Sequence, residues 1–314
     1  MTKIRIVNLI LALCLVFGAY GYYHNSDIIK GQKKIGAIYM TMNNSFYVAL
    51  NQPVEKQVKN HGDVFYTYNP CLNESKQCEQ IDQLVAKGID ALIINPVTSY
   101  SEHLLNKLRE VKEKGIVIVV TDSSLNDETI SDCTVVSDNY GAGKQCAQDL
   151  MNRQKKAKIL LIEHREALSA VDRIRGFLDE ISSKQYQIVS RVESSGTTLK
   201  AMSEVQRIVD KGVQFDTIMA LNDPSALGAM AAIESRNLEN IRVYGVDGSP
   251  EMKKIIESKK GKIATCAQNP LQMGETTINA VYDLLEGKTI ESQIIIPVHM
   301  ITKDNIDEQT ISGW

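Results

Sequence analysis

The sequence predicts an α/β protein made of two lobes, each with a parallel sheet covered by helices. A length of 314 residues is too great for one ordinary domain and suits two. With 43% hydrophobic and 23% charged residues, the composition is that of a globular protein, which excludes wholesale disorder. Short apolar runs alternate with amphipathic stretches from residue 35 onward, as in parallel sheets buried on both faces.

The expected strands are short and mostly apolar. They are residues 35–41, 64–68, 91–94, 116–121, 133–137, 158–162, 188–192, 217–221, 241–246, 263–267 and 294–298. The amphipathic stretches between most of them predict helices, among them residues 45–60, 75–87 and 101–114. No Pro- or Gly-rich linker divides the alternation, so we expect two lobes that share crossing strands.

The beginning of the chain predicts export. Residues 1–5 carry two cations, and residues 6–23 are apolar apart from a single asparagine. Such a segment is a signal peptide cleaved after Gly21, a lipid-anchored leader ending before Cys14, or an uncleaved membrane anchor. The residue before Cys14 is not small, which disfavours the lipid anchor, and we favour the uncleaved anchor slightly over cleavage. In each case residues 24–34 form a tether, and the rest of the chain is extracytoplasmic, in the periplasm or on the outer face of the membrane.

Cysteine usage fits an exported protein. Cys71 and Cys78 flank a short polar stretch and could close a disulfide loop in an oxidising compartment, with two unpaired thiols as the alternative. Cys133, Cys146 and Cys266 fall in apolar or helical contexts and are expected to be core residues. We find no metal-ligand spacing among the cysteines and histidines, so we expect no metal site.

Several function classes are disfavoured. A net charge of −3 provides no broad positive field for nucleic acid. Residues 141–143 lack the third glycine of a dinucleotide fingerprint, and residues 286–289 lack the first glycine of a phosphate loop, where Tyr282 stands. Asp122 and Asp247 form a carboxylate pair that could serve glycoside hydrolysis, but both lie among amides and hydroxyls, which favours binding. We therefore expect neither an enzyme nor a cofactor.

Polar and aromatic residues follow the predicted strands, at the edge where parallel sheets bind ligands. Each could simply be a helix N-cap or a core aromatic. Together they provide carboxylates from both halves of the chain, amides, a guanidinium and an aromatic pair, which suits the hydroxyls and C–H faces of a sugar. The candidate ligand-binding residues are Asn44, Phe46, Tyr47, Asp122, Arg173, Asn222, Asp247 and Gln268.

Six stretches of the chain are similar to those of a known family, the ribose/galactose-type periplasmic sugar-binding proteins. These stretches are residues 43–47, 88–96, 136–139, 173–177, 222–229 and 245–248, within a resemblance that runs from about residue 35 to 303. The resemblance implies the type I periplasmic binding protein fold, with two Rossmann-like doubly wound lobes and a three-strand hinge. The crossings would fall near residues 136–137, 268–269 and 297–298. The lobes would then comprise residues 35–136 with 269–297, and residues 137–268 with 298–314.

The resemblance also implies that the candidate residues contact the sugar, with Gln268 at a crossing. The chain departs from the ribose-type pattern at three places. Met40 replaces a small polar residue, Ser123 replaces an arginine, and Gly196 or Thr197 stands near the position of a stacking aromatic residue. These departures argue against ribose itself and leave another small sugar or polyol as the expected ligand.

Closure of the lobes over a sugar suggests delivery to an ABC permease. The alternative is a membrane-anchored sensor that presents its closed form to a histidine kinase, and a remote one is a glycoside-processing enzyme. A sugar-responsive repressor would need a basic helix-turn-helix of about sixty residues before the lobes. We expect none, because only 34 largely apolar residues precede the first strand.

Overall fold

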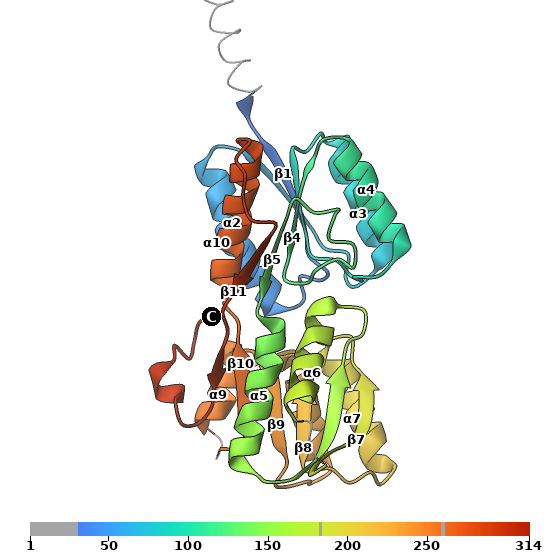
Figure 1. Cartoon of the computed structure of the whole chain (residues 1–314), viewed down its shortest axis with the longest axis vertical. Helices are drawn as coiled ribbons and strands as arrows, with labels where there is room; N and C mark the ends of the chain where they lie inside the picture. The colour runs from blue at the N-terminus through green and yellow to red at the C-terminus, as the bar shows by residue number, and fades with distance from the viewer. Residues whose placement is uncertain (1–30, 182–183, 259–260) are drawn as a thin grey trace, which may run out of the picture.

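The computed structural model describes residues 31–181, 184–258 and 261–314, which form two α/β lobes (Figure 1). The expected signal or anchor segment at residues 6–23 lies outside the described residues. Within the described ranges, no helix combines the length and the apolar character that a membrane crossing requires. The predicted two-lobe α/β architecture is confirmed.

The first lobe has a six-stranded parallel sheet in the order β11-β5-β4-β3-β1-β2. Its strands are β1 (Lys34–Ile38), β2 (Val64–Tyr68), β3 (Ala91–Ile94), β4 (Val117–Thr121), β5 (Cys133–Ser137) and β11 (Gln293–Ile296). β1 ends three residues earlier than predicted, so residues 39–44 form a connection that leads into the first helix. β3 and β5 are buried at every position, as expected of strands covered on both faces.

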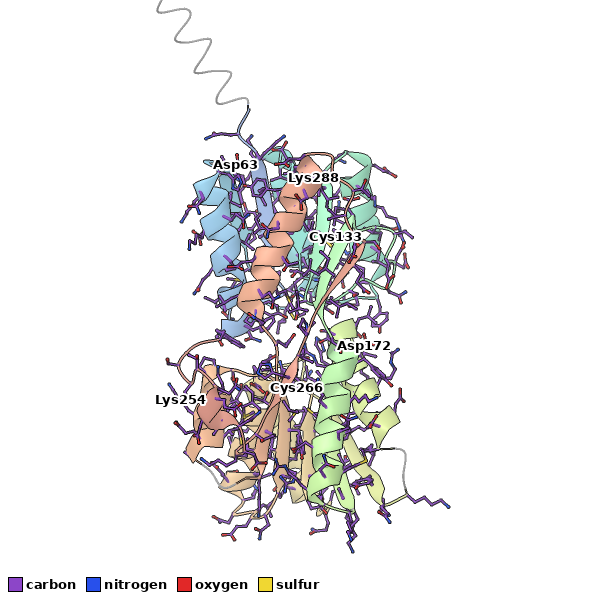
Figure 2. The ribbon with its side chains drawn as sticks, turned by 60° about the vertical axis from the view of Figure 1, so that its left-hand side comes forward. Asp63, Cys133, Asp172, Lys254, Cys266 and Lys288 are labelled. Carbon is purple, nitrogen blue, oxygen red and sulfur yellow. The ribbon has the colours of Figure 1, made fainter. Side chains whose placement is uncertain are left out.

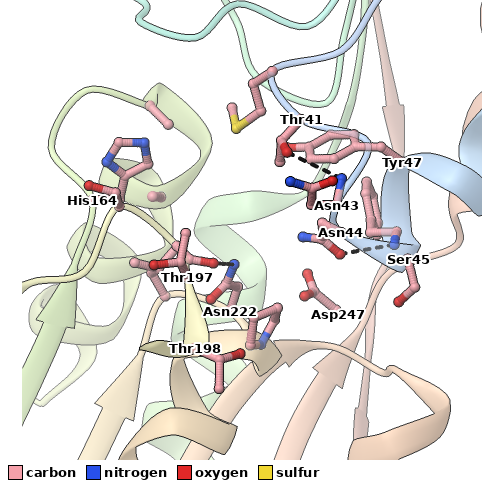
Figure 3. Close-up of a pocket in the computed structure, with 18 of the residues that line it drawn as sticks. Thr41, Asn43, Asn44, Ser45, Tyr47, His164, Thr197, Thr198, Asn222 and Asp247 are labelled. Atoms are coloured by element: carbon pink, nitrogen blue, oxygen red, sulfur yellow. Dashed lines mark hydrogen bonds between the residues drawn. The ribbon is translucent and has the colours of Figure 1, made fainter. Parts of the chain in front are cut away.

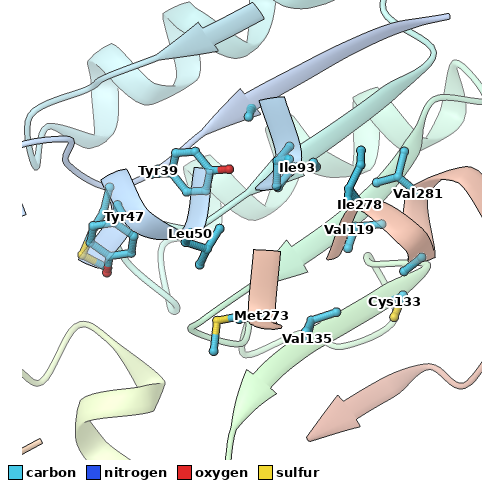
Figure 4. Packing of buried hydrophobic residues seen from close by; sticks show 14 of the residues in the cluster. Tyr39, Tyr47, Leu50, Ile93, Val119, Cys133, Val135, Met273, Ile278 and Val281 are labelled. Atoms are coloured by element: carbon cyan, nitrogen blue, oxygen red, sulfur yellow. The ribbon is translucent and has the colours of Figure 1, made fainter. Parts of the chain in front are cut away.

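Four helices cover the first lobe, two on each face of the sheet (Figure 1). They are α2 (Ser45–Asn60), α3 (Glu74–Ala86), α4 (Glu102–Glu113) and α10 (Pro270–Leu285). Each begins after an Asn or Ser whose side chain accepts a hydrogen bond from a backbone N–H of the first turn, which explains where these helices start. Figure 4 shows the core beneath α2 and α10, where Tyr39, Leu50, Ile93 and Ile278 pack together.

The second lobe repeats the plan with the strand order β12-β10-β9-β8-β6-β7. Its strands are β6 (Ala157–Glu163), β7 (Tyr186–Glu193), β8 (Thr217–Ala220), β9 (Arg242–Asp247), β10 (Ile263–Ala267) and β12 (His299–Ile301). Its helices are α5 (Asn139–Arg153), α6 (Leu168–Glu180), α7 (Thr198–Asp210), α8 (Asp223–Ser235), α9 (Pro250–Ser258) and the 3₁₀ helix η1 (Ile306–Glu308). One apolar cluster lies beneath α5 and α6, and another lies beneath α7, α8 and α9.

The chain crosses between the lobes three times, from β5 to α5, from β10 to α10 and from β11 to β12. Figure 2 shows Cys133 within the first lobe and Cys266, near the end of β10, within the second. The strand predicted at residues 294–298 is β11, which ends two residues earlier, and the chain then crosses into the second lobe and forms β12 in the other sheet. β12 is also antiparallel to β10, since it enters the second lobe where β10 leaves it.

Candidate functional site

A cavity of about 660 Å³ lies between the lobes, at the carboxyl ends of the parallel strands. Figure 3 shows side chains converging on it, with Asn44 and Tyr47 from the first lobe opposite Thr197 and Asn222 from the second. All eight candidate residues line this cavity: Asn44, Phe46, Tyr47, Asp122, Arg173, Asn222, Asp247 and Gln268. The structure therefore brings the predicted set together, while its role in binding a ligand stays a prediction.

The first turn of α2 forms one wall of the cavity. Asn44 is the N-cap, and its Oδ1 accepts a hydrogen bond from the N–H of Phe46 at 3.0 Å. This cap holds Phe46 and Tyr47 in the first turn, where their rings meet edge to face with centroids 5.4 Å apart. Asn44 thus has the structural role of a cap, and it lines the cavity as well.

Asp122 follows β4 and is almost completely buried, with 4% of its surface exposed. Its φ of 66° lies in the left-handed region, which turns the chain sharply at the end of the strand. The hydroxyl of Tyr47 donates to its Oδ2 at 3.0 Å, and Nδ2 of Asn95 donates to the same oxygen at 3.2 Å. Burial raises the pKa of this carboxyl, and the positive charge of Arg173 and these two hydrogen bonds oppose the rise.

Arg173 lies on α6, and the second lobe holds its guanidinium in place. Its Nε donates to Oδ1 of Asn139 at 2.8 Å, and its Nη1 donates to the carbonyl of Leu221 at 3.0 Å. The same group lies 3.9 Å from Oδ1 of Asp122 and 3.8 Å from Oδ1 of Asp247. It therefore sits between a carboxylate of each lobe, beyond direct hydrogen-bond distance of either.

Asp247, at the end of β9, is the most strongly perturbed acid of the cavity. Burial raises its pKa well above the usual range, and the nearby Asp223 raises it further, while Arg173 lowers it. Nε2 of Gln268 donates to its Oδ1 at 2.8 Å. The other amide atom of Gln268, Oε1, is buried and has no hydrogen-bond partner among the described residues, so it is available to a ligand.

The cavity is rich in acidic groups. The charged side chains among the described residues that line it are the carboxylates of Asp122, Asp247 and Glu251 and the guanidinium of Arg173, apart from the imidazole of His164. An anionic ligand would meet this surplus of carboxylates at short range. A neutral ligand whose hydroxyls donate to carboxylates and accept from the guanidinium fits better.

Asn222 is the N-cap of α8 and also lines the cavity, while its contact with a ligand stays a prediction. Its Oδ1 accepts from the N–H of Ser225 at 3.0 Å, which caps α8, and its Nδ2 donates to the carbonyl of Gly196 at 3.1 Å. A Cβ at Gly196 would lie 3.1 Å from that Nδ2, and the φ of 68° there favours glycine.

Ser123 does not line the cavity, although it replaces a residue expected to contact sugar. It is fully buried, and its Oγ accepts a hydrogen bond from the N–H of Ser169 in the other lobe at 3.2 Å. At the other two departures, Met40 lines the cavity, and so do both Gly196 and Thr197. Residue 123 therefore joins the two lobes and does not contribute to the cavity lining.

Trp314 is a cavity residue that the sequence reasoning missed. Its ring meets Phe46 edge to face, with centroids 5.6 Å apart, although its chain segment follows β12 of the second lobe. The buried Lys253 on α9 donates to the carbonyl of Gly313 at 2.5 Å and holds this segment against the lobe. The sequence feature that could have singled out this residue is that Trp314 is the single tryptophan of a chain poor in aromatic residues.

The disulfide considered for Cys71 and Cys78 is not formed. Both are free thiols, with Cys71 exposed at the rim of the cavity and Cys78 buried on α3. Cys78 instead lies beside Glu74 and His103. Sequence spacing did not reveal this cluster, because His103 belongs to a different helix.

Comparison with known proteins agrees with this architecture. A family model described as periplasmic binding protein domain matches residues 35–289. The ribose import binding protein of Bacillus subtilis is 29% identical over 278 residues, covering 87% of this chain and 89% of that protein. The xylitol-binding protein of Mycolicibacterium smegmatis is 25% identical over 307 residues, covering 96% and 84%. A Bacillus halodurans ABC transporter solute binding protein, solved with bound myo-inositol, has a TM-score of 0.81 at 20% identity, covering 88% of this chain and 97% of that one.

Proposed function

The chain belongs to the periplasmic binding protein family, and we propose that it binds a small neutral sugar or polyol outside the cytoplasm and delivers it to an ABC transporter. The relatives named above support the ligand class, since their names mention ribose and xylitol. The chain is a binding protein and not an enzyme. No observation on the described residues favours the histidine-kinase sensor alternative.

The observation that carries the proposal is the set of polar side chains that line the cavity. Carboxyl groups from both lobes, Asp122 and Asp247, flank the guanidinium of Arg173, and the amide oxygen of Gln268 has no partner in the part of the chain that the structure describes. Sugar hydroxyls both donate and accept, so one ligand can satisfy all four groups together. Phosphate esters and other anions fit poorly, because among the described residues three acidic side chains line the cavity against one guanidinium, and an anion beside them must either be repelled or keep them protonated.

Aromatic rings provide the apolar part of the site. Phe46 belongs to the first lobe, and Trp314 reaches it from the second, so the two rings meet across the boundary between lobes. We infer that Trp314 supplies the stacking surface that the family pattern places near residues 196–197. A ring face covers the C–H surface of a sugar, whereas the polar groups engage its hydroxyls.

Closure of the lobes follows from the way the site residues are divided between them. Tyr47 and Asp122 lie on one lobe, and Arg173 and Asp247 lie on the other. A ligand stabilises a conformation only through its differential affinity, and a ligand between the lobes contacts both sets only when they are closed. Sugar binding therefore favours the closed form, which an ABC transporter would recognise.

Isothermal titration calorimetry of the purified full chain tests this function. The panel contains ribose, xylitol, myo-inositol and further pentoses, hexoses and polyols, with ribose 5-phosphate as the anionic comparison. We expect one neutral member to bind with 1:1 stoichiometry and the phosphate ester not to bind. Asp247→Ala should weaken that binding about tenfold or more, since a hydrogen bond to a charged group contributes about 1.5–3 kcal/mol.

The matched control is Asp210→Ala, which removes an exposed carboxylate of the second lobe that pairs with Arg236. This variant should bind like the wild type. Failure of every neutral sugar and polyol to bind, or equal losses in the two variants, would contradict the proposal.

A further inference from the structure

We propose that Glu74, Cys78 and His103 form a binding site for a zinc-class divalent metal ion on the first lobe, separate from the sugar cavity. None of the three residues lines that cavity. The proposal rests on where the helices place the three side chains, on the distances between their ligand atoms and on their chemistry.

Two helices bring the ligands together. Glu74 and Cys78 lie four residues apart on α3, so their side chains share one face of that helix. His103 is the second residue of α4, which packs beside α3 (Figure 1). Two ligands therefore come from a rigid helical turn and the third from its neighbour.

The separations suit a shared tetrahedral ion. Nδ1 of His103 lies 3.4 Å from Oε1 of Glu74 and 3.8 Å from Sγ of Cys78, and all three ligand atoms lie within 4.8 Å of one another. Ligands bound to one zinc ion at about 2.0–2.3 Å with tetrahedral angles lie about 3.4–3.6 Å apart. Adjustments of a few tenths of an ångström at these two pairs reach that geometry.

The donor set selects the class of metal. A thiolate and an imidazole favour zinc over the hard cations Ca²⁺ and Mg²⁺, which prefer oxygen ligands. Three protein ligands leave a fourth tetrahedral position for water. Glu74 also borders a second hollow between the lobes, which gives water a route to that position.

Surrounding groups orient the ligands. The hydroxyl of Ser101, the N-cap of α4, donates to Oε1 of Glu74, as an outer-shell donor does for a carboxylate ligand. Lys107, whose positive charge acts on the Cys78 thiol, is paired with Asp82 at 3.0 Å and with Glu110 at 2.9 Å, so its charge is balanced. When the metal–sulfur bond forms, the Cys78 thiol releases its proton to solvent.

Cobalt substitution tests the site, because Co²⁺ bound to a thiolate gives a charge-transfer absorption that unbound Co²⁺ lacks. The full chain, treated with chelator and kept reduced, is titrated with Co²⁺ and then with Zn²⁺. We expect the absorption to saturate at one ion per chain and to disappear as Zn²⁺ displaces Co²⁺. Cys78→Ser should abolish it, and His103→Ala should weaken metal binding about tenfold or more.

Matched controls come from the same lobe. Cys71→Ser removes the neighbouring exposed thiol, and His61→Ala removes an imidazole outside the cluster; both should bind like the wild type. The His103 side chain is 64% exposed, so His103→Ala decides the matter if Cys78→Ser does not fold. Absence of the thiolate absorption in the wild type, its persistence in Cys78→Ser, or unchanged affinity in His103→Ala would overturn the site. Sugar titration of the same samples measures the proposed function separately, so the metal site and sugar binding can fail independently.

Discussion

Neighbouring groups shift the pKa of the Asp247 carboxyl in opposite directions. Asp223 disfavours the charged form, whereas Arg173 and the amide of Gln268 favour it. The carboxylate of Asp223 accepts from Thr265 Oγ1 at 2.6 Å and from the Ser249 N–H at 2.8 Å, and its charge raises the pKa of Asp247. The backbone N–H of Asp223 also donates to Oδ2 of Asp247 at 3.3 Å. The cavity therefore holds a carboxyl group whose protonation is coupled to the fold.

This coupling predicts how stability depends on pH. Burial and Asp223 raise the pKa of Asp247 in the folded state above its unfolded value near 4. Its contribution is therefore fully present below pH 4 and is lost as the pH rises through the raised pKa, with a slope of up to about 1.4 kcal/mol per pH unit. Urea unfolding of ligand-free protein from pH 4 to 8 should show this decline in the wild type and a smaller decline in Asp247→Asn. Parallel curves for the two proteins would contradict the assignment to Asp247.

Trp314 permits a test of the second aromatic wall. Trp314→Ala should weaken sugar binding roughly two- to tenfold, because an aromatic contact contributes about 0.5–1.5 kcal/mol beyond area burial. Trp314→Phe keeps a ring and should retain part of the affinity. Since Trp314 is the single tryptophan, its fluorescence should change when the wild type binds sugar. Full affinity in Trp314→Ala would remove this ring from the site.

At the scale of elements, the position of Arg173 depends on a close helix crossing. A Cβ at Gly143 of α5 would lie 1.8 Å from the carbonyl oxygen of Arg173 on α6, and one at Gly176 would lie 2.0 Å from the carbonyl oxygen of Tyr140. Each helix therefore presents a glycine where the other helix's backbone approaches. The crossing holds α6, and with it the guanidinium, close to the hinge.

Substituting Gly143 tests this link between packing and binding. Gly143→Ala should lower the free energy of unfolding by about 1–3 kcal/mol, because the added methyl group forces the helices apart. Sugar affinity should fall as well, since α6 carries Arg173. Gly31→Ala is the control, because a Cβ there would meet nothing within 4 Å among residues 31–181, 184–258 and 261–314. Equal stability of the two variants in urea would show that α5 and α6 tolerate the extra methyl group.

At the scale of the whole molecule, the lobes also touch through hydrogen bonds between side chains and backbone groups beside the cavity. The N–H of Ser99 donates to the carbonyl of Glu166 at 2.7 Å, and the Thr98 hydroxyl donates to its carboxylate at 2.9 Å. Ser123 and Ser169 add a third contact. These bonds join the two lobes and therefore depend on how they are placed relative to one another.

Thr98→Val should consequently weaken sugar binding two- to tenfold without altering the cavity, since one hydrogen bond contributes about 0.5–1.5 kcal/mol to the closed form. Thr129→Val is the matched control, because its hydroxyl bonds to Asp127 within one lobe at 2.6 Å. Calorimetry measures the affinities, and small-angle scattering measures whether ligand-free Thr98→Val is more open than the wild type. A loss of the same size in Thr129→Val would argue against an effect on closure.

Much of the fold and of the cavity lining could be predicted because parallel sheets place their carboxyl ends on one edge. Asp122 and Asp247 each lie at the end of a recognisable strand, so the alternation of strands and helices predicted that both would line the cavity. Asn139, which orients Arg173, and Asn95, which donates to Asp122, are contacts between elements and have no local pattern. The antiparallel pairing of β12 could not be predicted either, because it depends on where the chain enters the second lobe and has no local sequence pattern.

The sequence by itself determined the alternation of strands and helices, the helix caps and the residues at the strand ends, because these depend on neighbours a few positions away. Only the tertiary structure decided that Trp314 meets Phe46, that Ser123 joins the lobes and that His103 lies beside Cys78. Such contacts join residues far apart in the chain or on separate helices, and their partners are set by how lobes and helices pack rather than by spacing along the sequence.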